Sequence, residues 1–485
     1  MTGTDRPERL DTRTRIALGA MSLAVFVIAN DITSLSVALP RIERDFGVDV
    51  STVQWVMNAY TLGFGVLIVT GGRLSDILGR RRTFFMGVTV FALCSAVAAV
   101  AGSAGVLIAA RAAMAIGAAL IWPSVVGLIF GLVPPARAGL AGGLLLGVSG
   151  IGNALGPMVG GFLTDRLSWR WILVLNLPIA AAAITLVALY IDHDAPAETR
   201  ERLDWAGVTT LSVGLVTLLV ALDQASDWGW GDPRIIGLLI ISVVSLVALV
   251  ITQRRGGRDA LVPRDVIGTR AFASACVTIV LVSGIWFAVL LYAPQYMEKI
   301  LGFSALRAGV AFLPMLLTFS VTAFTAGWLY NHMGPRLPLL CGTACMPLGA
   351  LLLSLVGTSS PYLTMVPGLI VVGIGVGLFY STVTNAALTA LDPSRTGLGS
   401  GLTFMFQLVS GALGVAIATT VFTSVSRSHP GAHVGFVAGL HAGLRLEAAI
   451  AVCGLATVWW VGGSTTSTDE LDSAEQLESR AALGD

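Results

Sequence analysis

Fourteen long apolar stretches dominate this 485-residue chain and leave few folds open to it. Hydrophobic residues make up 55% of the sequence and charged residues 12%, whereas about 25% of a soluble globular domain is charged. Each stretch has roughly the 20 residues with which a helix crosses a bilayer. Because backbone polar groups in lipid must bond within their own segment, we expect an all-α integral membrane protein. The predicted spans are residues 16–39, 53–72, 84–104, 105–131, 138–164, 169–191, 205–222, 234–252, 272–295, 305–328, 336–357, 360–390, 397–423 and 437–462.

A ten-residue pattern occurs twice, each time between two apolar stretches. It reads Gly-x-Leu, four residues, then Gly-x-Arg, and it starts at Gly72 and again at Gly327, 255 residues later. A second echo relates residues 135–156 to residues 393–414 with an offset of 258. Internal duplication of this kind is typical of secondary transporters. The sequence therefore predicts two pseudo-symmetric six-helix halves.

The repeat leaves the seventh and eighth spans without a counterpart, which gives a plan of six, two and six helices. The end of the chain is rich in Ser and Thr and then in Asp and Glu, a composition that we expect to be disordered. The predicted division is an N-terminal six-helix half (1–191), a linker with two inserted helices (192–271), a C-terminal six-helix half (272–462) and a disordered cytoplasmic tail (463–485).

The basic residues predict an orientation. With both termini in the cytoplasm, 19 of the 29 Lys and Arg residues fall in inside segments and 9 in outside loops. Cytoplasmic loops carry the excess of basic residues, so we expect both termini inside. Nearly all these residues are Arg, and Ala and Gly are abundant, which suggests a GC-rich bacterial genome. The expected location is the bacterial inner membrane.

The sequence lacks the features of an ATP-driven protein, an enzyme or a metalloprotein. The single lysine, Lys299, follows Glu298 rather than Gly, so no phosphate-binding loop ends in Gly-Lys. His429 and His433 are one helical turn apart, but Pro430 breaks the helix that metal ligation would need. No Gly-x-Ser-x-Gly nucleophile motif occurs, and a net charge of +1 provides no basic stripe for nucleic acid. We expect no enzymatic activity, no metal, no cofactor and no nucleic-acid partner.

Several motifs resemble those of a known family. The segment Gly72–Arg82 resembles the loop signature between helices 2 and 3 of the major facilitator superfamily, and Gly147 with Gly156–Gly161 resembles the fifth-helix signature of its antiporters. With fourteen spans, the chain looks like the EmrB/QacA branch of drug:proton antiporters. Met114 and Ala115 depart from that branch, which usually has Gln and Gly there. Further similar stretches are Asp31 to Pro40, Trp169–Ile172 with Asn176 and Pro178, and Asp204–Gly207.

Asp31 is an acid within an apolar span, where function is the default interpretation. With a rise of about 1.5 Å per residue, Asp31, Tyr60 and Arg111 lie roughly 12, 10 and 9 Å below the outer ends of their spans, in one layer. Burial disfavours the carboxylate, whereas Arg111 favours it. A group under these opposed effects can exchange a proton when its neighbour moves. We predict a proton-coupling or substrate site formed by Asp31, Arg111 and Tyr60; the alternative is a pair that only holds helices together.

The loop after the second span predicts a cytoplasmic gate. A carboxylate is stabilised at the amino end of a helix, and we expect Asp76 to bind the start of the eleventh span, after Pro335. The alternative is a solvated charged loop. The predicted gate residues are Gly72, Asp76, Gly79, Arg80 and Arg81.

Glycines recur along one face of the fifth span, where a neighbouring backbone can approach closely, and a proline there removes a hydrogen bond and bends the helix. We expect a close, bendable contact between the two halves; the alternative is generic glycine packing. The predicted antiporter motif consists of Gly147, Gly152, Gly156, Pro157, Gly160 and Gly161.

Aromatic and amide side chains supply candidates for a cavity that binds planar lipophilic cations. Glu447 is a second acid, either functional or simply at a span boundary. Under the repeat offsets Asp76 aligns with Asn331 and Asp31 with Trp286, so we assign coupling and the gate to residues 1–191 and an opposing apolar wall to the second half. The cavity candidates are Trp55, Asn58, Trp122, Trp286, Tyr292, Phe379, Tyr380, Phe406 and Gln407.

We therefore expect a proton-coupled antiporter that exports lipophilic, cationic or aromatic drugs by alternating access, with the proton gradient as its energy source. Its partners would be small lipophilic substrates, protons and the lipid bilayer, and it would act as a monomer. A dedicated exporter of an endogenous metabolite or antibiotic is the first alternative, for which we expect a more polar cavity. A non-transporting membrane scaffold or sensor is the second, and it leaves Asp31 and Gly156-Pro157 unexplained.

Overall fold

The computed structural model describes residues 11–134, 137–193, 203–256 and 260–461. In this part of the chain every regular element is a helix, and fourteen helices are long and apolar enough to cross a membrane. The predicted all-α membrane fold is confirmed. The long helices are α1 (Thr12–Phe46), α2 (Val50–Leu78), α3 (Arg80–Ala99), α4 (Ala104–Leu132), α5 (Ala138–Arg166), α6 (Arg170–Tyr190), α7 (Trp205–Trp228), α8 (Pro233–Gly256), α10 (Arg270–Lys299), α12 (Leu313–Met333), α13 (Arg336–Leu353), α14 (Val366–Thr389), α15 (Thr396–Arg427) and α16 (Ala432–Val461). Two short helices, α9 (Arg264–Ile267) and α11 (Ala305–Ala311), lie between them.

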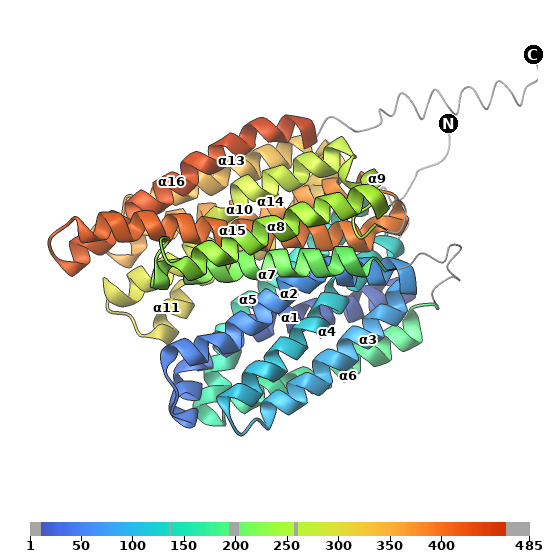
Figure 1. The fold of residues 1–485 in the computed structure, drawn as a ribbon, viewed down its shortest axis with the longest axis horizontal. Helices are drawn as coiled ribbons and strands as arrows, with labels where there is room; N and C mark the ends of the chain where they lie inside the picture. Colours follow the sequence, from blue (N-terminus) through green and yellow to red (C-terminus); the bar gives the residue numbers. More distant parts are fainter. Residues whose placement is uncertain (1–10, 135–136, 194–202, 257–259, 462–485) are drawn as a thin grey trace, which may run out of the picture.

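The long helices form two bundles with one arrangement. In the first, α1 packs on α5 and α6, while α2 and α3 pack on α4. In the second, α10 packs on α15 and α16, while α12 and α13 pack on α14. The bundles meet along two lines, where α2 contacts α15 and where α5 contacts α12; we call these lines the α2–α15 seam and the α5–α12 seam. In Figure 1 the blue to cyan bundle and the yellow to red bundle lie against each other.

Two turns at one end of the molecule explain why glycine recurs in the ten-residue pattern. Gly79 joins α2 to α3 with a φ of 97°, and Gly334 joins α12 to α13 with a φ of 72°. Only glycine adopts such angles without strain. We call the end of the bundle that carries Gly79 and Gly334 the latch end.

The inserted helices lie on one side of the molecule. The green helix α7 packs against both α2 and α15 and so crosses the α2–α15 seam, with α8 outside it (Figure 1). Only 11% of the most apolar segment of α8 is buried. A helix with such an exposed apolar surface is stable in lipid, where its backbone bonds are internal. Asp204 fixes the start of α7, because its carboxylate accepts hydrogen bonds from the Gly207 N–H (2.8 Å) and from Nε2 of Gln253 on α8 (2.8 Å).

Two predicted spans begin later than the apolar pattern indicates. The stretch 305–328 is divided into α11 and α12, and the stretch 360–390 opens with a 3₁₀ turn, Tyr362–Thr364, before α14. Pro314 and Pro367 stand in the first turns of α12 and α14. Proline suits a first turn because it has no N–H to donate. The predicted tail, 463–485, lies outside the described residues.

Candidate functional site

Asp31 and Arg111 form an ion pair in the interior of the first bundle. Nη1 of Arg111 on α4 donates to Oδ2 of Asp31 on α1, and both side chains are 0% exposed. Nε of Arg111 donates to the Val56 carbonyl on α2 (3.1 Å). The pair therefore joins α1, α2 and α4. The sequence also placed Asp31 and Arg111 at similar depths in the membrane.

Two neutral side chains complete the surroundings of Asp31. Nδ2 of Asn176 on α6 donates to Oδ1 of Asp31 (2.9 Å) and to Oγ of Ser95 on α3 (3.1 Å). The Ser95 hydroxyl in turn donates to the Leu173 carbonyl (2.9 Å). Both carboxylate oxygens of Asp31 thus have a donor. In the sequence Asn176 is marked only by a motif similar to the family. Ser95 was not predicted, because a single serine in an apolar span forms no pattern.

Tyr60 lies in the same layer, as predicted, but it contacts the pair through its ring. The Arg111 guanidinium carbon is 4.2 Å from the centre of the Tyr60 ring. A cation over an aromatic face is attracted to it, most strongly away from water. The Tyr60 hydroxyl and Nη2 of Arg111 are buried without a hydrogen-bond partner among the described residues. The Tyr60 hydroxyl and one nitrogen of Arg111 could therefore form further hydrogen bonds beside the ion pair.

Asp76 holds the α2–α15 seam at the latch end. Its carboxylate accepts hydrogen bonds from the N–H groups of Gly397 (3.0 Å) and Leu398 (2.8 Å), in the first turn of α15. These N–H groups have no partner within the helix, and the helix dipole favours a negative charge there. As predicted, the Asp76 carboxylate binds at the start of a helix, but the predicted helix, the eleventh span, was wrong. Asp76 binds α15, the thirteenth span, because the fold pairs α2 with α15.

Asn331 makes the equivalent contact at the α5–α12 seam. Its Oδ1 accepts a hydrogen bond from the N–H of Gly139 (3.0 Å), in the first turn of α5. The repeat offsets relate Asn331 to Asp76 and Gly139 to Gly397. Assignment of the gate to residues 1–191 alone was therefore wrong. An amide oxygen can accept the same hydrogen bond as a carboxylate, so the second half retains a neutral form of the contact.

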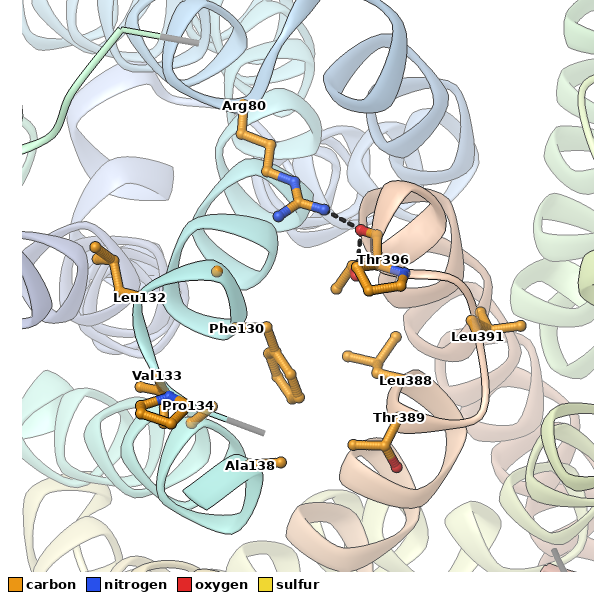
Figure 2. A pocket seen from close by; sticks show the side chains of 13 residues that line it. Arg80, Phe130, Leu132, Val133, Pro134, Ala138, Leu388, Thr389, Leu391 and Thr396 are labelled. Carbon is orange, nitrogen blue, oxygen red and sulfur yellow. Dashed lines mark hydrogen bonds between the residues drawn. The ribbon is translucent and has the colours of Figure 1, made fainter. Parts of the chain in front are cut away.

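The two arginines of the predicted gate have different roles. Arg80 donates to the Gly127 carbonyl (2.7 Å) and, across the halves, to the Pro393 carbonyl. Arg81 donates to the Ala188 carbonyl at the end of α6 (3.2 Å), in the first half. Figure 2 shows Arg80 reaching the turn before α15. In that turn Asp392 accepts from the N–H (2.8 Å) and the hydroxyl of Ser394, and these hydrogen bonds lower the pKa of the Asp392 carboxyl.

A cavity of about 540 Å³ lies beside this contact, between the ends of α4 and α14 and the starts of α5 and α15. Phe130, Leu388 and Thr389 point into it, below the Arg80–Pro393 contact (Figure 2). Its lining is apolar apart from a few groups such as the Arg80 guanidinium and the Thr389 hydroxyl. The sequence does not predict this cavity, because helix ends that are far apart along the chain form it.

The glycines of α5 serve two contacts. Gly139, Gly143, Gly147 and Gly150, toward the latch end, face α12 of the other half. Gly152, Gly156 and Gly160 face α1 of the same half. The expected contact between halves was therefore assigned to the wrong part of the motif. Of that motif, only Gly147 approaches the second half through α12.

Pro157 is an internal residue of α5, and Gly161 is buried beside it. The proline ring lies near the short helix α11, since a Cβ at Gly309 would be 3.4 Å from the Pro157 Cβ. This contact brings the outer part of α5 close to the second half.

Gly160→Ala is expected to destabilise the first half. A Cβ there would collide with the Ser34 carbonyl oxygen of α1, and overpacking of this kind costs about 1–3 kcal/mol. Thermal unfolding of the purified protein in detergent would measure the loss. Gly237→Ala in α8 is the matched control, because nothing lies within 4 Å of its Cβ position. Equal melting temperatures for the Gly160 variant and the wild type would contradict the packing argument.

A small central cavity of about 20 Å³ lies between the halves. Trp122, Tyr380 and Gln407, all predicted, line it, and the Trp122 ring lies 4.9 Å from that of Phe404 on α15. The first half contributes apolar and aromatic residues, whereas the second half contributes Ile279 and Phe404 together with five polar residues. The prediction that the second half supplies an apolar wall is therefore wrong at the central cavity. The second-half polar residues are Tyr380, Thr384, Ser400, Thr403 and Gln407.

The other cavity candidates lie elsewhere. Trp286 packs on Phe319 at 5.6 Å between ring centres, and Asn58 donates to Asp223 of α7 (3.2 Å). None of the remaining candidates is among the residues that line the central cavity. They are Trp55, which is 36% exposed, Tyr292, Phe379 and Phe406.

Asn385 of α14 was missed altogether. Its amide is buried, neither its oxygen nor its nitrogen has a hydrogen-bond partner among the described residues, and it faces Gly142 of α5. Glu447 is also buried, at the middle of α16 rather than at its boundary.

Two related six-helix bundles, seams closed by equivalent contacts and a buried ion pair define a multi-pass membrane transporter. A profile of the Major Facilitator Superfamily matches residues 21–415. The puromycin resistance protein pur8 of Streptomyces alboniger is 33% identical over 484 residues, which cover 97% of this chain and 96% of that protein. The cephamycin export protein CmcT of Amycolatopsis lactamdurans is 32% identical over 433 residues, 88% of each chain. This chain belongs to the Major Facilitator Superfamily, and its relatives include drug and antibiotic efflux proteins.

The fold is shared with more distant transporters. The crystal structure of the human organic anion transporter MFSD10 superposes with a TM-score of 0.66 at 16% identity, over 92% of this chain and 99% of that one. This likeness concerns the fold alone.

Proposed function

We propose that this protein is a proton-coupled antiporter that exports lipophilic drugs across the bacterial cytoplasmic membrane. The observation that carries the proposal is the buried Asp31–Arg111 pair. Ionisable residues are costly within a bilayer and are kept for pathways and proton relays. The relatives named for puromycin resistance and cephamycin export support the substrate class. The proton gradient supplies the energy, no cofactor takes part, and one chain suffices.

Transport would proceed by alternating access between the two halves. The central cavity of about 20 Å³ has room for little more than a water molecule. A drug can therefore enter only after the halves separate. Release of the Asp76 and Asn331 contacts would open the latch end, and their renewal would close it. Since most basic residues fall in the loops of that side, we assign the latch end and both termini to the cytoplasm.

A dedicated antibiotic exporter is the second candidate. The polar side chains that the second half presents to the central cavity favour it, because polar groups select substrates by directed hydrogen bonds. A scaffold without transport has no use for such groups.

Uptake into inverted membrane vesicles tests the function. Vesicles with an acidic lumen would receive ethidium, puromycin or a cephamycin, with and without the pH gradient. We expect gradient-dependent accumulation that vesicles without the protein do not show. Accumulation of both ethidium and puromycin indicates a multidrug exporter, and accumulation of one antibiotic alone indicates a dedicated one. Uptake that persists after the gradient is collapsed would argue against proton antiport.

A further inference from the structure

Glu447 is a buried acid that the coupling site in the first half does not use. It lies at the middle of α16, is 2% exposed, and its Oε1 has no hydrogen-bond partner among the described residues. Membrane helices rarely contain such a group without a function. A structural acid would be expected to have a partner, as Asp31 has in Arg111.

The packing around Glu447 leaves room for its carboxyl group. A Cβ on Gly284 of α10 would collide with Oε2 of Glu447, and a Cβ on Gly414 of α15 would lie 3.2 Å from Oε1. The carboxyl group therefore lies where three helices meet, next to two glycines. Larger residues at either glycine would displace it.

The position of Glu447 mirrors that of Asp31. In the first half, Asp31 on α1 is hydrogen-bonded to α6 through Asn176. In the second half, α10 corresponds to α1 and α16 to α6, and Glu447 on α16 lies against α10 at Gly284. Each half thus places one carboxyl group where its first helix meets its sixth. The first helix carries the acid in the first half, and the sixth helix carries it in the second half.

The charged and titratable groups nearby do not neutralise Glu447. No described basic side chain forms an ion pair with it. On α10 the facing group is Tyr292, which interacts with it electrostatically; Cys276 and Lys299 lie toward the two ends of that helix. On α16, Arg445 donates to the Ser354 hydroxyl (3.3 Å) and His441 contacts the Val356 carbonyl (2.7 Å), both beyond the end of α13. The remaining such residues on the packed helices are Arg270, Tyr296 and Glu298 of α10, Arg336, Cys341 and Cys345 of α13, Tyr380 of α14, Arg427 of α15, and His433 and Cys453 of α16.

Two hydroxyl groups lie on the outer side of Glu447. Tyr292 lies about 12 Å further along α10 than Gly284, by a rise of about 1.5 Å per residue. Its hydroxyl donates to Thr419 on α15 (2.7 Å). Hydroxyls can accept and donate protons in turn, so Tyr292 and Thr419 place two such groups between the level of Glu447 and the end opposite the latch end.

We propose that Glu447 is a second exchangeable-proton site, so that two protons enter for each drug cation exported. The proposal rests on the proposed function, with Asp31 carrying the other proton. Glu447 takes up one proton from the outer side after the drug has left and releases it to the cytoplasm when the next drug molecule binds. One cation out against two protons in moves one net positive charge inward per cycle.

The response to membrane potential tests this stoichiometry. In inverted vesicles with an imposed pH gradient, a lumen-positive potential set by potassium and valinomycin should raise ethidium uptake by the wild type. Glu447→Gln should retain uptake driven by the pH gradient but lose the response to potential, because one proton against one cation is electroneutral. The control Glu298→Gln, at an exposed position on α10, should respond like the wild type. A Glu447→Gln variant with the wild-type response would overturn the proposal.

A second measurement does not depend on transport. Infrared difference spectra of the purified protein across a pH step should contain protonated-carboxyl bands of both Asp31 and Glu447 in the wild type. Glu447→Asp should keep two bands, and Glu447→Gln should lose the Glu447 band while keeping that of Asp31. Identical spectra for the wild type and Glu447→Gln would also overturn the proposal. No ethidium uptake by the wild type would refute the proposed function instead, and the infrared result would still decide whether Glu447 exchanges a proton.

Discussion

Asp31→Asn is expected to reduce gradient-driven uptake of ethidium into inverted vesicles to the background level. The amide keeps the size of the side chain and an oxygen for Asn176, but it cannot gain or lose a proton in the cycle. Uptake would be measured beside Asp165→Asn, an exposed acid at the opposite end from the latch, which should transport normally. Wild-type rates in Asp31→Asn would remove the coupling role.

The same substitution leaves Arg111 buried without its counter-ion. Breaking one side of a buried pair costs about 3–5 kcal/mol, whereas removing both charges is often close to neutral. We therefore expect the double variant Asp31→Asn with Arg111→Gln to regain much of the thermal stability and none of the transport. If the pair only held helices together, the double variant would transport again.

Asp76→Ala is expected to open the latch end about 10- to 30-fold more often than in the wild type. The loss of a helix cap costs about 1 kcal/mol, the loss of a charge at the helix start adds about 0.3–1 kcal/mol, and 1.4 kcal/mol corresponds to a factor of ten. Asn331→Ala loses one neutral hydrogen bond, about 1 kcal/mol, and should shift the population about five-fold.

Spin labels at the exposed positions Leu78 and Met333, one in each half, would report the separation of the halves at the latch end. Asp76→Asn should fall between Asp76→Ala and the wild type, because it keeps one acceptor oxygen. Asp165→Ala should leave the distance distribution unchanged. Equal distributions for Asp76→Ala and the wild type would show that the α2–α15 seam is held by packing alone.

The sequence was informative wherever a pattern repeats or a charge is out of place. Apolar length gave the fourteen spans, and helical rise brought Asp31 and Arg111 to one depth. Asn176 binds Asp31 and Ser95 binds Asn176, but both are neutral, so only the family motif marks Asn176 and nothing in the sequence marks Ser95. The partner of Asp76 depends on which helices pair across the halves, and an offset along the chain cannot reveal that pairing.

The second half shows the limit of comparing aligned positions. Asn331 was interpreted as a lost charge, although its oxygen keeps the contact with Gly139. The polar groups at the central cavity, such as Thr384 and Ser400, stand between apolar residues in the sequence and converge only when α14 meets α15. Under the offset of 258 Glu447 aligns with Leu189 rather than with Asp31, because its half places the buried acid on the other helix of the pair.

The inserted pair of helices makes the transporter unequal in the plane of the membrane. α7 covers the α2–α15 seam. Asn58 of α2 donates a hydrogen bond to Asp223 of α7, and Trp230, just after α7, donates one to Thr420 of α15. The α5–α12 seam has no such cover in the described part of the chain, and a cavity of about 450 Å³ there is lined by Phe324 and Trp328, with Trp328 58% exposed. A molecule dissolved in the bilayer can therefore approach the junction of the halves from one flank only. That flank can widen without displacing a covering helix, which gives the protein a sidedness that its internal symmetry alone would not.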